Sequence, residues 1–492
     1  MKLNLIFTFI LGLFFIQINA QTLRGQVVDA TSKEPIPFAN ITLGENYGVI
    51  SNDEGFFVIQ LKKHTEDKTI LISSLGHEEV EILVKDFKQN QVIPLSLSNF
   101  ELDEVFITNE QLTAFEIVEK FLENKKANHE QNNIQIQLFS RVNTQYEALD
   151  FKVDIKKVSF LKRNERNKFN EGLERIQKKT RGKITSVYKE SLLDLYKLKD
   201  TLINEQLKSL ELIKRDESID TDEVTQEVLY EVMKSIESEN TFKVKSGLFT
   251  LDKEIDLNEF IAQYEAKKQG NPIPDTLHHK ETFISDEYLK DSQYFNQEFF
   301  RNERRYEYAL EGITNAHGST CYHIKFYPNK NKAKFEGNLY INTKDFGMVA
   351  YDYQLIDGKK TNNINLKAIL GIKTNTFQLN RSYIFSRTEN GYYAKYIRKN
   401  EDSYVYFDRP IKFQENDVRR RDRKILKLGM FMEIIQQENT EYVAIEQQSI
   451  SEDVQDQLKF DSYILIDELS KYSPSYWEGY NIIEATQAIR SF

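Results

Sequence analysis

The stretch from residue 23 to residue 97 constrains the fold more than any other part of the chain. Short runs rich in β-branched and aromatic residues follow one another there, and most are followed by turn-forming residues. The runs include residues 23–29, 38–43, 56–61, 69–75, 79–84 and 92–97. Short strands at even spacing are typical of two packed sheets. The pattern therefore predicts a seven-stranded antiparallel β-sandwich.

The first twenty residues show the order of charge and apolar character of an export signal. Met1-Lys2 supplies a positive start, an apolar run covers residues 5–16, and Ala20 offers a small residue at a cleavage point. The alternative is a retained N-terminal anchor. The run is shorter than the roughly 20 residues that a membrane-spanning helix needs, which favours the signal peptide. We expect residues 1–20 to be a signal peptide and the chain to be exported.

The predicted sandwich, residues 21–99, carries a specific pattern of glycines and apolar residues. The pattern consists of Gly25, Val27, Asp29, Pro37, Ala39-Asn40-Ile41, Gly48, Ser51-Asn52, Gly55, Phe57, Ser73 and Leu75-Gly76. It resembles the carboxypeptidase-regulatory-like domain, although Asn52 stands where Asp is usual and His77 where an aromatic residue is usual. We expect Gly48 and Gly55 to supply turn conformations that other residues resist. The resemblance implies a transthyretin-like sandwich in an envelope protein of Bacteroidetes.

The resemblance also bears on function. In metallocarboxypeptidases this module accompanies the catalytic domain and carries no zinc ligand, which implies a docking or folding role. Residues 102–108, within a predicted linker over 100–112, resemble the segment that follows the module in TonB-dependent receptors. A strand-like linker is the alternative.

Residues 113–492 are expected to form a second, α+β domain. Four apolar residues between 115 and 122 recur at helical spacing and predict a helix over 113–128. Leucines at near-helical intervals predict a helical segment over about 185–240. Alternating runs between about 307 and 450 predict a curved antiparallel sheet with one polar face. The chain as a whole is therefore predicted to be mainly β.

Two groups of side chains in the second domain are candidates for contact with a partner or ligand. Tyr340, Tyr351 and Tyr353 lie in predicted strands and could line a groove in the curved sheet. The alternative is that these rings pack a core, because aromatic residues are favoured in strands in any case. Arg419, Arg420 and Arg421 form the one basic cluster and could touch anionic lipid, or form a solvated helix face. In the tail, Trp477 is expected to anchor the chain end.

Signals of catalysis are weak throughout the sequence. A zinc-peptidase helix needs His-Glu-x-x-His, and the sequence lacks this motif, the Gly-x-Ser-x-Gly elbow and the phosphate loop. His278, His279 and Glu281 supply half of a carboxypeptidase zinc site, and a loop is the alternative. Cys321, the only cysteine, is expected to be a packed apolar residue. We therefore expect no catalytic residue, no cofactor and no metal.

The charge of the chain narrows the choice of partner. A net charge of −10 disfavours nucleic acid, whose binding needs a basic surface. The leading hypothesis is a non-catalytic scaffold or binding protein in the periplasm or at the periplasmic face of the outer membrane. Its partner would be an envelope protein or a lipid. The alternatives are a carrier of lipid or another apolar ligand held in the curved sheet, and an exported hydrolase.

Overall fold

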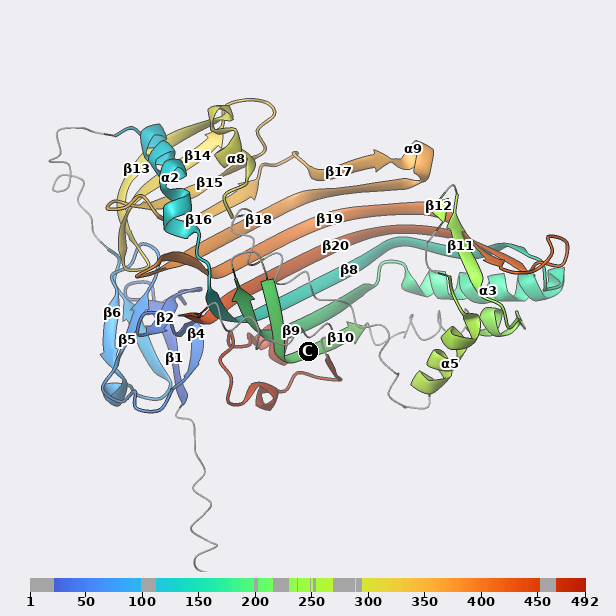
Figure 1. The fold of residues 1–492 in the computed structure, drawn as a ribbon, viewed down its shortest axis with the longest axis horizontal. Helices are drawn as coiled ribbons and strands as arrows, with labels where there is room; N and C mark the ends of the chain where they lie inside the picture. The colour runs from blue at the N-terminus through green and yellow to red at the C-terminus, as the bar shows by residue number, and fades with distance from the viewer. Residues whose placement is uncertain are drawn as a thin grey trace, which may run out of the picture.

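The computed structural model describes most of the chain. It covers residues 22–98, 112–198, 202–215, 230–236, 238–247, 249–250, 254–268, 288, 294–451 and 466–492. The predicted signal peptide, the predicted linker up to residue 111 and the His278–Glu281 candidate lie outside the described residues. Figure 1 shows a small sandwich at one end of a large sheet.

The N-terminal unit consists of two small sheets packed face to face. Its strands are β1 (Thr22–Asp29), β2 (Asn40–Leu43), β3 (Gly48–Ile50), β4 (Phe56–Gln60), β5 (Thr69–Ser73), β6 (Val80–Leu83) and β7 (Gln91–Leu95). One sheet has the order β4-β1-β7 and the other the order β3-β2-β5-β6. The alternation of apolar residues that predicted these strands places one side of each sheet in a common core. The prediction of purely antiparallel pairing was wrong, because β1 and β7 run parallel, with Gly25 opposite Gln91.

Two glycines of the family pattern have different roles in the sandwich. Gly55 has φ +75°, so it occupies a turn conformation that other residues resist. Gly48 lies within strand β3 instead, and a Cβ atom there would lie 2.3 Å from the carbonyl oxygen of Ile41. The expected turn role of Gly48 was therefore wrong, and close approach of the backbone explains the glycine.

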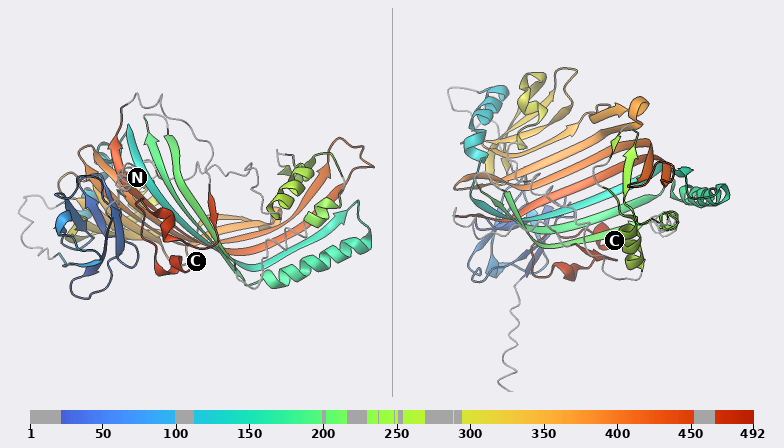
Figure 2. Two further views of the ribbon diagram at one scale, coloured as in Figure 1. Left: turned by 90° about the horizontal axis from the view of Figure 1, so that it is seen from below. Right: turned by 45° about the vertical axis from the view of Figure 1, so that its right-hand side comes forward.

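The second unit is built on one large sheet. Its strands are β8 (Ile134–Val158), β9 (Ile184–Lys197), β10 (Leu202–Arg215), β11 (Phe242–Ser246), β12 (Phe249–Thr250), β13 (Tyr306–Ala316), β14 (Ser319–Pro328), β15 (Phe335–Asn342), β16 (Met348–Leu355), β17 (Thr361–Leu366), β18 (Ile372–Thr388), β19 (Gly391–Glu415), β20 (Ile425–Ser449) and β21 (Asp467–Leu469). The main order is β13-β14-β15-β16-β18-β19-β20-β8-β9-β10-β21. β8, β19 and β20 each have 25 residues, or roughly 80 Å of extended chain. Figure 2 shows that the sheet is strongly curved.

Strands β9 and β10, which end at residue 215, replace the first part of the helical segment predicted over about 185–240, whereas residues 230–234 are helical. Leu192 and Leu193 point to opposite faces of β9, and both are fully buried. A strand covered on both sides reads as a nearly continuous apolar run and loses its alternation. The spacing of the leucines imitated a helix for this reason. The sheet therefore begins at residue 134, well before the predicted residue 307.

The helices lie on and beside the sheet. They are α2 (Ala114–His129), α3 (Arg163–Thr180), α5 (Leu257–Lys268), α8 (Glu298–Arg301), α9 (Lys367–Leu370) and α10 (Gln487–Arg490), with single 3-10 turns at Val84–Asp86, Glu303–Arg305 and Pro474–Trp477. The prediction of α2 is confirmed, and Thr113 and Glu116 form a capping box at its start. None of the described helices combines the length and apolar character that a membrane span needs.

The two faces of the large sheet have different cover. The sandwich and the C-terminal tail, residues 466–492, pack on one face, which we call the sandwich face. Helices α2 and α8 pack on the other, the helix face. Neighbouring residues of β8 show the alternation, because Leu138 belongs to the core of the helix face and Phe139 to that of the sandwich face. At the end far from the sandwich, α3 and α5 pack with Phe413, Leu426 and Leu428.

Candidate functional site

The three candidate tyrosines do not form one site. Tyr351 and Tyr353 lie in the core of the helix face, and Tyr351 is only 1% exposed. The Tyr351 ring stacks on Tyr383 with ring centroids 4.4 Å apart. Tyr340 belongs to the same core but packs its ring on His323, with centroids 4.8 Å apart. The alternative of core packing is therefore the one that the structure shows for these rings.

The basic cluster lies far from these tyrosines. Arg419, Arg420 and Arg421 are exposed in the turn that joins β19 to β20, at the end of the sheet opposite the sandwich. The cluster is thus a hairpin turn, and the prediction of a helix face was wrong. A hairpin fits here because β19 and β20 are antiparallel neighbours along almost their whole length.

A buried contact joins the sandwich to the large sheet. Phe38 of the sandwich stacks on Tyr396 of β19 with ring centroids 5.2 Å apart. Lys395 is completely buried, and its Nζ donates to the carbonyl oxygens of Gly48 at 2.9 Å and Ala444 at 2.5 Å. Burial lowers the pKa of Lys395 from 10.5 to about 7. At the rim, Arg398 pairs with Asp53 at 3.0 Å.

A buried row of charges lies beneath the C-terminal tail. Arg141 stands opposite Glu190 on one side and opposite Glu441 on the other, across three neighbouring strands. Its guanidinium donates to Glu190 Oε1 from Nε at 2.8 Å and from a terminal nitrogen at 2.6 Å. The same guanidinium donates to the carbonyl oxygen of Ile483 at 2.6 Å, and Trp477 Nε1 donates to Glu190 Oε2 at 2.5 Å. The expectation that Trp477 anchors the tail is confirmed.

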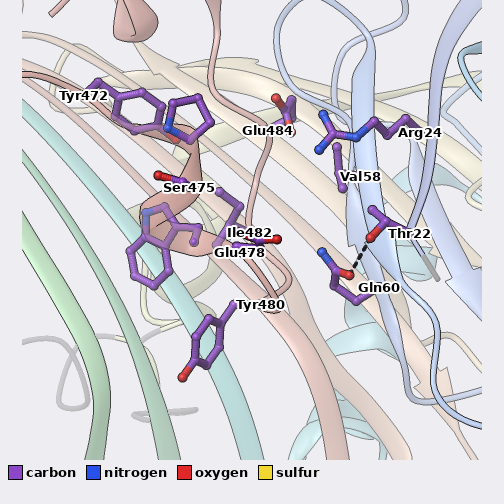
Figure 3. A pocket seen from close by; sticks show the side chains of 13 residues that line it. Thr22, Arg24, Val58, Gln60, Tyr472, Ser475, Glu478, Tyr480, Ile482 and Glu484 are labelled. Carbon is purple, nitrogen blue, oxygen red and sulfur yellow. Dashed lines mark hydrogen bonds between the residues drawn. The ribbon is translucent and has the colours of Figure 1, made fainter. Parts of the chain in front are cut away.

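An open cleft of about 450 Å³ lies between the tail and the sandwich. One wall is the outer face of the sheet β4-β1-β7, which contributes Thr22, Arg24, Val58 and Gln60, and the other wall is the tail (Figure 3). Asn481 holds the walls together, because its Oδ1 accepts from the backbone nitrogen of Gln60 at 2.7 Å. Arg24, Glu478 and Glu484 give the lining charges of both signs. The cleft is therefore a mixed polar and apolar site between two parts of the molecule.

The same outer face carries exposed apolar side chains beside the cleft. Phe56 of β4 and Val92 of β7 both stand opposite Gln26 of β1, in the row next to Arg24 and Val58. Phe56 is 41% exposed and Val92 is 56% exposed. Outward-pointing apolar residues next to a polar cleft are a common feature of protein-binding surfaces. We call this surface, with the cleft, the docking face. Val92 is out of phase with the buried Ile93 and Leu95 of β7, and that alternation was the signal available in the sequence.

A second hollow, of about 480 Å³, lies on the sandwich face of the large sheet. Lys325, Asn338, Asp352 and Ser382 stand opposite one another across four neighbouring strands there. Asn338 links the row to His323, since its Oδ1 lies 3.0 Å from His323 Nε2 and its nitrogen donates to Asp352 at 3.0 Å. Burial raises the pKa of Asp352. The row is a hydrogen-bonded polar surface.

The Cys321 thiol and the His129 imidazole are reactive groups that are buried in the described part of the chain. Burial raises the pKa of the Cys321 thiol, which lies in the core as predicted. His129, the last residue of α2, is buried. Its Nε2 accepts from the backbone nitrogen of Met348 at 3.0 Å, and burial lowers its pKa to about 3. Within the described ranges, no three His, Cys, Asp or Glu side chains are placed to hold a metal ion.

Comparison with known proteins identifies the sandwich. Residues 23–107 match the model of the CarboxypepD_reg-like domain. None of the curated proteins matches the chain in sequence.

Solved structures give only faint likenesses. Lipovitellin is 7% identical with a TM-score of 0.19, covers 65% of this chain and is itself covered over 26% of its length. A DUF1329 family protein from Desulfovibrio piger is 9% identical (TM-score 0.17), and MucB is 8% identical (TM-score 0.14). The match with each of these two proteins covers 65% of this chain and 92% of the other protein's chain. At such TM-scores these structures do not guide the assignment of fold or function.

Proposed function

We propose that the chain is a non-catalytic, exported envelope protein that binds a partner protein on its docking face. The observation that carries the proposal is the cleft, whose walls come from the two ends of the chain. Asn481 joins these walls to each other, and the buried contacts of Lys395 and Trp477 fix both to the large sheet. A binding surface held in this way is preorganised, which reduces the entropy lost on association. The large sheet serves as the scaffold.

The filled helix face favours a scaffold over a lipid carrier. The rings expected to line a groove, such as Tyr351 and Tyr353, are packed with Phe299 under α8. A hollow beside His129 and Tyr392 has a volume of about 20 Å³, or room for one water molecule. We place the protein in the periplasm or at the periplasmic face of the outer membrane, since its sandwich matches a domain that implies envelope location.

The test is photo-crosslinking from single positions in the native cell. A photoreactive residue at Val92 lies on the docking face, and one at Leu83 is a matched control, because Leu83 is an exposed apolar residue on the other sheet of the sandwich. The proposal predicts a discrete protein adduct from Val92 that is absent from Leu83. Equal adducts from both positions, or no adduct from Val92, would contradict it.

A further inference from the structure

Four lysines form a row across the large sheet at the end far from the sandwich. Lys245 of β11 stands opposite Lys412 of β19, Lys412 opposite Lys427 of β20, and Lys427 opposite Lys157 of β8. We call these four residues the lysine row. Neighbouring strands lie about 4.8 Å apart, so the four side chains emerge within roughly 15 Å of one another.

The lysine row is electrostatically unfavourable in the folded protein. Like charges directly opposite each other destabilise a sheet. None of the four lysines forms an ion pair with a carboxylate in the described part of the chain, and Lys412 donates instead to the amide oxygen of Gln414 at 2.8 Å. Burial and the charges of the other three lysines and Arg423 lower the pKa of Lys412. A bound anion would relieve this repulsion.

The lysine row lies on the face opposite the core that α3 and α5 form with the large sheet. Lys412 has the same parity along β19 as Tyr396, which faces the sandwich, whereas Phe413 faces the core formed with α3 and α5. The exposed turn of Arg419, Arg420 and Arg421 adjoins the row at the tip of the same hairpin. The chain is acidic overall, but residues 412–427 of this hairpin carry seven lysines or arginines against three acidic residues.

An apolar tip lies at the same end of the sheet. Ile369 of α9 is 81% exposed, and Ile364 and Leu366 of β17 are also exposed. Figure 1 shows α9 at the far end of the sheet, next to β18 and β19. Lys367 lies 4.0 Å from the ring centroid of Tyr406, a residue with the same parity as Lys412. The apolar tip is therefore bordered by lysine on the face that carries the lysine row.

We propose that this end of the sheet docks onto the surface of an anionic phospholipid bilayer. The lysine row and the arginine turn hold headgroup phosphates, and Ile369 with Leu366 reaches the boundary of the acyl chains. The exposed aliphatic side chains select a bilayer over a soluble polyanion, which would leave them in water. The inference rests on the proposed export of the chain but uses the opposite end of the molecule from the docking face.

The test is flotation of the purified full chain with phosphatidylcholine vesicles, with and without phosphatidylglycerol. Binding is expected only to the anionic vesicles and is expected to weaken as salt is added. The double variant K412Q/K427Q should weaken binding by roughly 10- to 30-fold, given the contribution of each lysine near an anionic surface. I369S should weaken it by roughly tenfold. The matched control K85Q/K126Q removes the same charge from exposed lysines elsewhere and should bind like the wild type.

Three results would overturn the proposal. The first is that the wild type does not bind anionic vesicles, and the second is that K85Q/K126Q loses as much binding as K412Q/K427Q. The third is that K412Q/K427Q loses binding while I369S binds like the wild type, which would indicate a soluble polyanion as the ligand. Thermal unfolding checks the variants, because removal of opposed charges should leave the melting temperature unchanged or higher. A negative result in the vesicle experiment does not change the crosslink expected from Val92, so the two proposals can be refuted independently.

Discussion

Lys395 Nζ lies 2.9 Å from the carbonyl oxygen of Gly48, so a completely buried lysine joins the large sheet to the sandwich. Lys395 occupies a bulge in β19, since Ile384 stands opposite Tyr396 and Phe385 opposite Ala394. A bulge re-aims a side chain away from the regular alternation of a strand. The contact therefore depends on one extra residue in one strand.

The buried lysine predicts a specific dependence of stability on pH. The pKa of Lys395 is about 7 in the folded chain, against 10.5 for a lysine exposed to water, so the unfolded chain binds more protons between these values. The free energy of unfolding should therefore rise with pH across this window, by up to about 1.4 kcal/mol per pH unit from this group. Urea unfolding of the wild type and of Lys395→Met at several pH values measures this pH dependence. Parallel profiles for the two proteins would refute the assignment.

The buried charge row predicts a large penalty for removing its cation. Arg141→Ala leaves Glu190 buried with its charge uncompensated, and the cost should be about 3–5 kcal/mol of unfolding free energy. Lys189→Ala is the control. Lys189 is the neighbour of Glu190 and pairs with Glu211 at 2.7 Å in a more exposed setting, so its loss should cost about 1 kcal/mol or less. Equal costs in urea unfolding would show that the Arg141 row is not buried as described.

The anchor of the tail can be tested by removing one hydrogen bond. Trp477→Phe keeps an aromatic ring but leaves Glu190 Oε2 without the indole donor, so it should cost about 1–3 kcal/mol. Tyr480→Phe, at a more exposed aromatic residue of the same tail, should change stability by about 0.5 kcal/mol or less. Circular dichroism during urea unfolding follows both variants. A cost for Trp477→Phe no larger than that for Tyr480→Phe would contradict the anchor.

Two glycines predict effects of opposite sign. Gly48→Ala would place a Cβ atom 2.3 Å from a main-chain oxygen, and strand β3 would have to shift at a cost of about 1–3 kcal/mol. Gly172 lies in helix α3 with open space around it, so Gly172→Ala should stabilise by about 0.5–1 kcal/mol. Thermal unfolding of both variants measures the difference. Stabilisation by Gly48→Ala would refute the close packing of β3 on β2.

Local patterns in the sequence predicted the fold where one side of an element is buried. Strands β1 and β7 and helix α2 follow from alternation or helical spacing in their own residues. β9 was misread because both of its faces are covered. The pairing of β8 with β20 joins residues such as Leu138 and Ala444, and no local pattern reports a register between segments so far apart.

The candidate site was less accessible to sequence reasoning than the fold. Tyr351 and Tyr353 have the composition of a binding groove, but the position of α8 over them decides that they form a core. The docking face needs the tail beside β4, and the lysine row needs the register of β8, β11, β19 and β20. Each depends on contacts between distant segments, which composition and spacing do not encode.

The sandwich is a fixed part of the scaffold and not a tethered module. A protease site placed within residues 100–110, between β7 and α2, allows the chain to be cut after folding. The two fragments should stay together in size-exclusion chromatography, because the contacts of Gly48, Phe38 and Asp53 with the large sheet persist without the covalent link. Separation of the cut fragments into two species under native conditions would contradict it.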